Sequence, residues 1–273
     1  ELCTPFFKKV KNLSGAKIIA IDHNPRPLKG YPLKKQLKKR LKGLFYGNYI
    51  DLFVGVSNYT SREIIKDFGK HLSDRTVTIH NGVNAINIKK RKVRNYKTPI
   101  FLVASHLRES KGVQDLIRAV SLLNKKDIAK LKIDIYGDGP LRNNLKKQVS
   151  LNDLQSVFTF MGSVDNLKQI YCQYDFLLHP SRSETYGYVV IESLISNVPV
   201  ITTKNIGNVL GVVKNNKNGY VFDVGNTEQI SKILNGILNN KLLISTEEME
   251  KGQIALKKYH LAEMIKNHFN LIK

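Results

Sequence analysis

The sequence predicts an α/β protein made of two lobes, each with a parallel β-sheet wrapped in helices. From residue 100 onward, short β-branched runs alternate with longer helical patterns, which is the rhythm of strand–helix–strand units. The first hundred residues show the same rhythm more sparsely. Between these parts, the polar and basic stretch 84–99 interrupts the hydrophobic period, which is typical of a domain boundary.

The second lobe is predicted to cover residues 99–245. Its strands are expected at residues 100–105, 132–136, 157–160, 175–179, 199–202 and 220–222, and its helices near 112–124, 140–149, 165–173, 187–197 and 226–239. Strands that alternate with helices in this way form a doubly wound, Rossmann-like parallel sheet.

The first lobe is predicted to cover residues 1–98 and is shorter of strands. We expect strands at residues 17–21, 52–56 and 77–80, with helices at 33–46 and 60–70. Because a nucleotide-binding lobe usually has about five or six parallel strands, this N-terminal lobe is expected to be incomplete. The remaining residues, 246–273, form a C-terminal helical segment whose apolar stripe needs a surface to cover it.

The composition points to a globular protein with an anionic partner. Of 273 residues, 42% are hydrophobic and 24% charged, which is ordinary for a folded domain. Lys and Arg outnumber Asp and Glu by 44 to 22, a net charge of +22, which suits nucleic acid, an anionic lipid surface or phosphorylated small molecules. Nucleic acid is not expected, because no zinc-finger or ribonucleoprotein motif is present.

Cysteine usage and hydropathy indicate the setting. Cys3 and Cys172 are far apart in the sequence and provide neither a disulfide framework nor the spacing of metal ligands. A reducing, cytoplasmic environment is therefore expected. The apolar runs are all well below the roughly 18 residues that a membrane-spanning helix needs.

The predicted helix at residues 33–46 is basic and amphipathic. Leucines recur along it at helical spacing, at positions Leu33, Leu37, Leu41 and Leu44, among six Lys and Arg residues between 34 and 42. Such a helix can lie on an anionic membrane, where each cation near the surface contributes roughly 1 kcal/mol to the binding free energy. A solvated face above an ordinary core stripe gives the same pattern, so the sequence leaves both interpretations open.

The segment 180–192 has the strongest chemical pattern in the chain. It follows a predicted buried strand, contains Gly187 in a loop and continues into a helix. The free N–H groups and dipole of a helix that begins after a parallel strand favour a phosphate. Glu184 falls in the loop and Glu192 in the helix, where a carboxylate can accept hydrogen bonds from two adjacent sugar hydroxyls.

This segment resembles the E-x7-E motif of retaining GT-B glycosyltransferases, in particular glycosyltransferase family 4, also called glycosyl transferases group 1. The resemblance implies a GT-B-like fold of two Rossmann-like lobes. It also implies that Glu184 contacts the donor sugar and that Glu192 holds the ribose. The backbone amides of Tyr186, Gly187 and Tyr188 are implied to meet the diphosphate.

The loop at residues 104–112 is similar to the same family. There, an Arg and a Lys usually neutralise the diphosphate, and Lys111 is retained in this chain. His106 stands where the family usually has Arg, and a neutral imidazole supplies no fixed charge. We therefore add the hypothesis that Arg108, two residues further on, provides the missing charge.

Two more positions are implied by the resemblance. Gly162 lies in the stretch whose backbone runs beside the nucleobase of the donor. His23, within Asp22-His23-Asn24-Pro25, stands after a strand where the family has a histidine near the donor sugar and the acceptor. We therefore expect His23, Lys111 and Glu184 to form the catalytic set.

The resemblance implies a retaining, metal-independent glycosyltransferase that uses a UDP- or GDP-sugar and no cofactor. The expected acceptor is a glycan or a lipid-linked carrier in surface polysaccharide biosynthesis. The expected location is cytoplasmic, with peripheral contact to the inner face of the cytoplasmic membrane. Two alternatives remain: a sugar-nucleotide-binding module that is inactive alone or is half of a split enzyme, and a basic nucleic-acid-binding protein.

Overall fold

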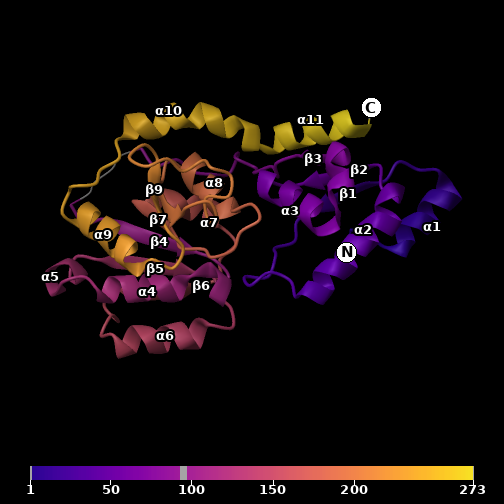
Figure 1. Ribbon diagram of the computed structural model, residues 1–273. Coiled ribbons are helices and arrows are strands. Elements are labelled where there is room, and N and C mark those ends of the chain that lie inside the picture. Colours follow the sequence, from indigo (N-terminus) through magenta and orange to yellow (C-terminus); the bar gives the residue numbers. More distant parts are fainter. Residues whose placement is uncertain (1, 93–96, 273) are drawn as a thin grey trace. The chain divides into compact units, whose positions relative to one another are not determined.

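The computed structural model describes residues 2–92 and 97–272. The chain divides into two compact units, Glu1–Gly82 with Ala262–Lys273, and Val83–Leu261. Each unit contains one parallel β-sheet, three strands in the first and six in the second, within the described residues (Figure 1). The prediction of an α/β fold with two parallel sheets is confirmed, whereas the incompleteness of the N-terminal lobe stays a prediction.

The units divide after Gly82 and after Leu261, whereas the predicted limits were 98/99 and 245/246. Residues before position 98 already bond to the second unit: the Arg91 N–H donates to the Ser196 carbonyl at 2.8 Å, and the Arg91 guanidinium meets the buried Asp175 at 2.6 Å. Beyond position 245, Gln253 donates to the side chain of Asn197 at 2.6 Å. Residues 93–96 of the predicted boundary lie outside the described residues.

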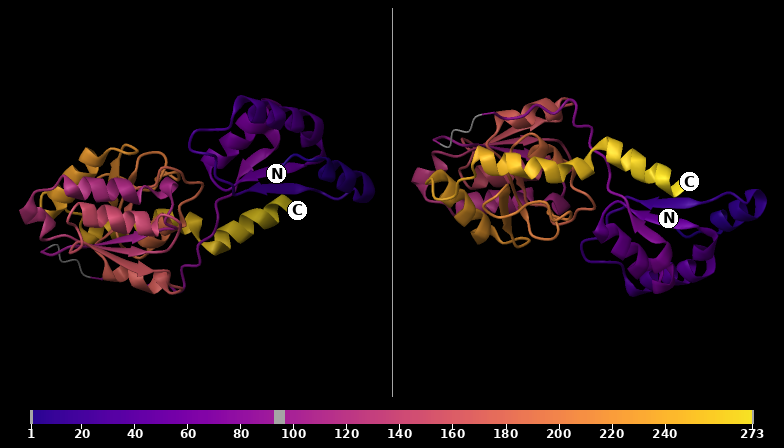
Figure 2. Two further views of the ribbon diagram at one scale, coloured as in Figure 1. Left: turned by 90° about the horizontal axis from the view of Figure 1, so that it is seen from below. Right: turned by 90° about the horizontal axis from the view of Figure 1, so that it is seen from above.

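The first unit has the sheet order β1-β2-β3, with β1 at Ile19–Asp22, β2 at Leu52–Gly55 and β3 at Thr76–Thr78. Helices α2 (Leu33–Tyr46) and α3 (Asn58–Phe68) pack against each other on one side of these strands (Figure 2). Helix α1 (Pro5–Ser14), which the pattern did not predict, precedes β1. The strands and the two later helices lie close to their predicted positions.

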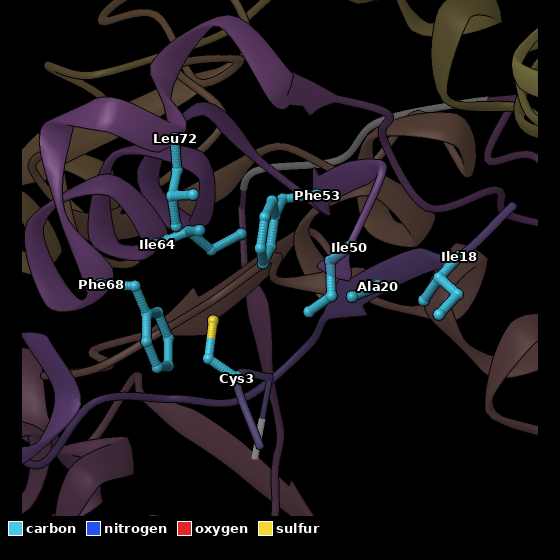
Figure 3. Close-up of a cluster of buried hydrophobic side chains, with 8 residues drawn as sticks. All are labelled: Cys3, Ile18, Ala20, Ile50, Phe53, Ile64, Phe68 and Leu72. Atoms are coloured by element: carbon cyan, nitrogen blue, oxygen red, sulfur yellow. The ribbon is translucent and has the colours of Figure 1, made fainter. Parts of the chain in front are cut away.

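In the core of the first unit, a residue from the beginning of the chain packs against side chains of the strands and of α3 (Figure 3). One cluster of this core contains eight buried residues: Cys3, Ile18, Ala20, Ile50, Phe53, Ile64, Phe68 and Leu72. Cys3 is buried in this cluster and packs as a small apolar side chain. Gly43 allows α2 to touch α3, because a Cβ at this position would lie 1.8 Å from the Phe68 carbonyl oxygen.

Helix α2 turns its leucines outward. Its buried residues are Lys39 and Gly43, whereas Leu33, Leu37, Leu41 and Leu44 are exposed. Of the two interpretations of this helix, the ordinary core stripe is therefore wrong for the residues that the structure describes. The amphipathic period was predicted correctly, but it does not tell which side of the helix packs.

The second unit has the sheet order β6-β5-β4-β7-β8-β9. All six strands are parallel and match the prediction to within two residues: β4 Ile100–Ala104, β5 Lys132–Tyr136, β6 Phe158–Gly162, β7 Phe176–His179, β8 Val200–Thr203 and β9 Gly219–Phe222. Phe101 and Phe176 stack between neighbouring strands with ring centroids 5.6 Å apart. These central strands are buried on both faces, as a doubly wound sheet requires.

Helices cover both faces of this sheet (Figure 1). On one face α4 (Val113–Ser121) packs against α6 (Arg142–Leu151) and α9 (Thr227–Leu238), and on the other α8 (Tyr188–Ile195) packs against α10 (Thr246–Leu256). The short helices are α5 (Lys125–Ile128) and α7 (Leu167–Ile170), and α11 (Leu261–Ile272) ends the chain. None of the helices within the described residues has the length and hydropathy needed to cross a bilayer.

Candidate functional site

The sheet order of the second unit creates a switch point between β4 and β7. From β4 the chain adds β5 and β6 on one side, and it then returns to add β7, β8 and β9 on the other. The loops that follow β4 and β7 therefore leave the same edge of the sheet and diverge, which is where parallel sheets bind ligands. The predicted residues Lys111 and Glu184 lie on these two loops.

The loop after β4 approaches the loop after β7 through Gly112. This residue has a φ of 69° and directly precedes helix α4. A Cβ on Gly112 would lie 1.9 Å from the carbonyl oxygen of Pro180, so any side chain here would push the loops apart. Glycine thus allows Lys111, its neighbour, to reach the second loop.

Hydrogen bonds then clamp the two loops together. The backbone N–H of Arg182 donates to the Ser110 carbonyl at 2.8 Å, and the Ser181 hydroxyl oxygen lies 3.2 Å from the same carbonyl oxygen. The Arg182 guanidinium forms a bidentate pair with the buried Asp115 of α4, at 2.7 and 2.6 Å. A bidentate pair of this kind restrains orientation as well as distance.

Glu184 lies at the centre of a compact polar cluster. Its Oε1 accepts a hydrogen bond from the Lys111 ammonium and another from the Ser181 hydroxyl at 3.2 Å, and His179 Nε2 lies 3.1 Å away. Burial acts to raise the pKa of Glu184, but His179 and Lys111 lower this pKa to about 2. The carboxylate is therefore ionised throughout the neutral range and is held in one orientation.

Glu192 has a separate set of partners. It lies in α8 and accepts a hydrogen bond from the buried Tyr171 hydroxyl at 3.1 Å, while Lys168 Nζ is 3.8 Å from its carboxylate. Burial raises the pKa of Glu192. Glu184 and Glu192 thus occupy the predicted loop and helix, and each carboxylate is oriented by its own neighbours.

Three of the residues between the carboxylates, Tyr186, Gly187 and Tyr188, lead into α8. Gly187 has a φ of 80° and directly precedes the helix, as the pattern predicted. Tyr186 is buried, and its ring lies 4.9 Å from that of Tyr188, whose side chain is exposed. The first backbone amides of α8 therefore follow Glu184 closely in the sequence, at the end of the same loop.

The other predicted residues are less tightly bound. His106 and Arg108 are both exposed on the loop after β4. Gly162, at the end of β6, accepts a hydrogen bond from the Gly137 N–H at 2.7 Å. His23 belongs to the first unit, where its Nδ1 lies 3.5 Å from the side-chain amide of Asn81.

The model of the Glycosyl transferases group 1 family matches residues 84–255, well over half of the chain. The chain belongs to this family. A relative, the GtfA subunit of the UDP-N-acetylglucosamine–peptide N-acetylglucosaminyltransferase of Streptococcus agalactiae, is 29% identical over 67% of this chain and 36% of that subunit. The N-acetyl-alpha-D-glucosaminyl L-malate synthase of Bacillus anthracis is 28% identical over 53% of this chain and 37% of that enzyme. The chain spans little more than a third of the length of these two curated relatives.

Solved glycosyltransferase structures share the fold of this group 1 family member. HepE of Anabaena, in complex with UDP, has a TM-score of 0.80 at 16% identity, covering 97% of this chain and 74% of that one. TarM of S. aureus, solved with fondaparinux, alpha-GlcNAc-glycerol and UDP, has a TM-score of 0.75 at 21% identity, covering 95% and 51%. At these identities the likeness shows the fold, which is the two-sheet GT-B architecture.

Four residues of this group 1 site were not predicted from the sequence: His179, Ser181, Arg182 and Asp115. Three of them flank the motif, and a buried histidine at the end of an apolar strand is the signal that could have indicated the first. Asp115 lies 67 residues before its partner Arg182, so only the fold brings them together. Among residues 2–92 and 97–272, no three His, Cys, Asp or Glu side chains gather as a metal site would require, and metal independence stays a prediction.

The two exposed residues of the loop after β4, His106 and Arg108, yield a testable prediction. If Arg108 supplies the charge that His106 lacks, Arg108→Ala should weaken binding of a nucleoside diphosphate about tenfold, because one exposed charge-assisted contact is lost. His106→Ala should change it less than about threefold. Calorimetry with UDP and GDP measures both variants, and intact binding in Arg108→Ala beside lost binding in His106→Ala would reverse the assignment.

Proposed function

We propose that this chain carries the donor site of a retaining glycosyltransferase of family 4 that uses a UDP- or GDP-sugar. The proposal rests above all on the paired Lys111 and Glu184 at the switch point of the sheet. This edge combines an ammonium, an ionised carboxylate and the N-terminus of α8, which are the groups that a sugar nucleotide requires. The UDP complex of HepE, a protein of the same fold, supports a nucleotide donor.

In this proposal, each residue of the site binds one part of the sugar nucleotide. Lys111 and the backbone amides at residues 186–188 stabilise the diphosphate, with the dipole of α8 aligned to favour its negative charge. Glu192 accepts hydrogen bonds from the ribose hydroxyls and Glu184 from the donor sugar. Gly162 leaves room beside the nucleobase. Because Lys111 already bonds Glu184, binding of the donor has to share or redirect this ammonium.

The proposed reaction keeps the configuration of the anomeric carbon. The acceptor hydroxyl attacks on the face from which the diphosphate leaves, so one carbon–oxygen bond forms as the other breaks. A phosphate oxygen of the leaving group takes the hydroxyl proton, and the cationic groups stabilise the charge of the nucleoside diphosphate. No metal ion is needed in this scheme. His23 remains a catalytic candidate on the resemblance alone.

We further propose a glycan or lipid-linked acceptor and a role in surface polysaccharide biosynthesis. The names of relatives support this class, among them the poly(ribitol-phosphate) alpha-N-acetylglucosaminyltransferase of Staphylococcus aureus. The net charge of +22 supports a place at the inner face of the cytoplasmic membrane, where anionic lipids attract basic surfaces. A lipid-linked acceptor would be presented at that face.

Calorimetry against UDP-, GDP- and ADP-sugars is the direct test of donor binding. We expect one UDP- or GDP-sugar to bind in the micromolar range, with unchanged affinity in excess EDTA because no metal contributes. With the matching acceptor, NMR of the product should show the anomeric configuration of the donor. An inverted product would contradict retention, and loss of turnover in EDTA would contradict the metal-free scheme.

The same experiment separates the alternative functions. Donor binding without release of nucleoside diphosphate on addition of any acceptor would assign the chain as a sugar-nucleotide-binding module or as half of a split enzyme. Failure of every sugar nucleotide to bind would overturn the proposal. Tight, salt-sensitive binding of RNA that UDP-sugars do not displace would favour the nucleic-acid alternative.

A further inference from the structure

The outward stripe of α2 is a fixed feature of the first unit. Four leucines lie along it, with exposed fractions of 82% for Leu33, 61% for Leu37, 45% for Leu41 and 58% for Leu44. Phe45 is 63% exposed on the same helix. Isolated exposed leucines are common on protein surfaces, but a continuous stripe of them marks an interaction surface.

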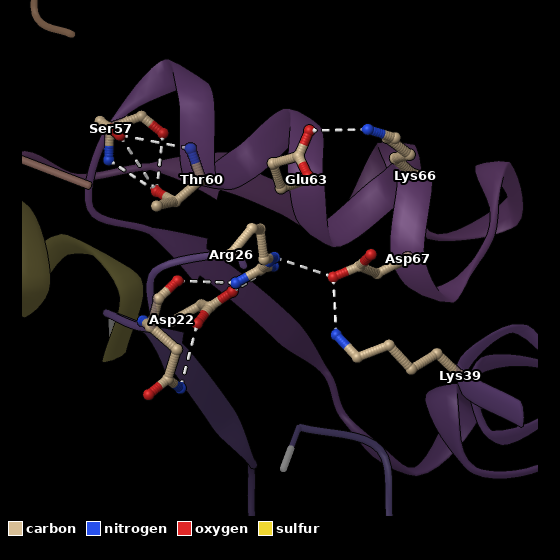
Figure 4. A network of polar contacts seen from close by, with 9 residues as sticks. Asp22, Arg26, Lys39, Ser57, Thr60, Glu63, Lys66 and Asp67 are labelled. Carbon is tan, nitrogen blue, oxygen red and sulfur yellow. Dashed lines mark hydrogen bonds and ion pairs between the residues drawn. The ribbon is translucent and has the colours of Figure 1, made fainter. Parts of the chain in front are cut away.

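A buried charge network fixes this orientation (Figure 4). Lys39 points from α2 to Asp67 of α3, with its ammonium 2.7 Å from the carboxylate, and Arg26 joins the same carboxylate at 2.9 Å. Arg26 also pairs with Asp22 at 2.7 Å. Turning α2 to bury its leucines would break the ion pair between Lys39 and the buried Asp67, and breaking a buried ion pair is strongly destabilising. The leucines therefore stay outward.

Basic side chains lie on both sides of the leucine stripe. On one side a pocket of about 850 Å³ is lined by five lysines of α2, namely Lys34, Lys35, Lys38, Lys39 and Lys42. On the other side, between α2 and α3, a pocket of about 550 Å³ is lined by Arg40, Arg62, Lys66 and Lys70 around apolar Leu44 and Ile65. Among the described residues, no carboxylate lines this second pocket.

We infer that the outward face of α2 docks on an anionic phospholipid bilayer, and that the pocket between α2 and α3 binds a headgroup phosphate through Arg40 and Arg62. The leucines enter the boundary between headgroups and acyl chains, while the flanking cations meet the phosphates. This inference rests on the membrane location proposed above and names the surface responsible for it.

The charge of the face decides between possible occupants. A second copy of the chain would bring two strongly cationic faces together, which like-charge repulsion opposes. A nucleic-acid backbone would meet the cations but would leave the leucine stripe against water or phosphate. An anionic bilayer satisfies both, because it offers phosphates at the surface and acyl chains directly below them.

Vesicle sedimentation tests this surface. Neutral vesicles of phosphatidylcholine are compared with anionic vesicles that also contain about 30% phosphatidylglycerol. Wild-type protein should bind the anionic vesicles at least about tenfold more tightly than the neutral ones. Leu37→Ser with Leu41→Ser, and separately Arg40→Gln with Arg62→Gln, should each weaken this binding about tenfold or more. Leu122→Ser with Leu151→Ser and Lys125→Gln with Lys126→Gln are matched exposed controls in the second unit and should bind as wild type.

Calorimetry with UDP-sugars on each variant keeps this test separate from the donor-binding proposal. Loss of vesicle binding with unchanged donor affinity supports the docking surface. Equal binding to neutral vesicles, or equal losses in the control pairs, would overturn it. If inorganic phosphate bound the protein as tightly as the anionic vesicles do and displaced them, the pocket would be an ion site without lipid recognition. That result would also overturn the inference. A failed donor test beside intact vesicle binding would leave this surface standing.

Discussion

Glu184→Gln is expected to lower kcat/KM for glycosyl transfer by about 100-fold or more while the protein stays folded. The amide keeps the shape of the side chain but removes the negative charge that orients Lys111 and the donor sugar, and loss of one such preorganised group typically costs about 10²–10³ in rate. Because Lys111 is then released from its partner, UDP should bind as tightly as to wild type or more tightly. Steady-state kinetics and calorimetry with UDP measure the two quantities.

Glu109→Gln provides the matched control for this substitution. Glu109 lies in the neighbouring loop, is exposed, and is 3.8 Å from the Arg182 guanidinium, so the variant loses the same charge without touching the cluster. We expect its kcat/KM to stay within about threefold of wild type, as for other exposed pairs. Wild-type turnover in Glu184→Gln would remove Glu184 from the reaction, and a collapsed melting temperature would show a structural role instead.

The Glu184 variant also has a pH signature. A carboxyl group with a folded pKa of about 2 and an ordinary unfolded pKa near 4.5 stabilises the protein above pH 4.5, and this stabilisation is lost as the pH falls toward 2. The difference in unfolding free energy between wild type and Glu184→Gln should therefore shrink between pH 4.5 and pH 2. Urea unfolding at several pH values gives this difference.

Gly112→Ala is expected to lower both stability and activity. Its left-handed backbone costs an alanine about 1 kcal/mol, and the added Cβ would meet the Pro180 carbonyl at 1.9 Å, so one of the two loops has to move. We expect a loss of about 3 kcal/mol in unfolding free energy. Because Lys111 is displaced from Glu184, kcat/KM should fall about 100-fold, as for comparable misplacements of reacting groups.

Gly225→Ala separates the strain from the clash. Gly225 has a similar φ of 75°, but a Cβ there meets no atom within 4 Å among the described residues. This control should therefore lose only about 1 kcal/mol and keep its activity. If Gly112→Ala matched Gly225→Ala in both urea unfolding and kinetics, the close approach of the two loops would not matter for the site.

Much of the second unit was predictable because its strands are buried on both faces. Runs such as residues 175–179 read as strands without reference to any contact, and the change from strand to glycine to helix placed Glu184 and Glu192 correctly. The partners of Glu184 were less accessible. Lys111 was indicated only by resemblance, and His179 was not recognised, because a histidine in an apolar run has the same pattern whether it is structural or part of a site.

The sequence by itself determined the alternation of strands and helices, the parallel sheets and the amphipathic period of α2. The tertiary structure decided which residues meet: Lys111 reaches Glu184 across 73 positions because β4 and β7 are neighbours in the sheet. It also decided that the α2 leucines point outward, through the pairing of Lys39 with Asp67. Periodicity tells which side chains share a face, whereas the direction of that face depends on contacts between residues distant in the sequence.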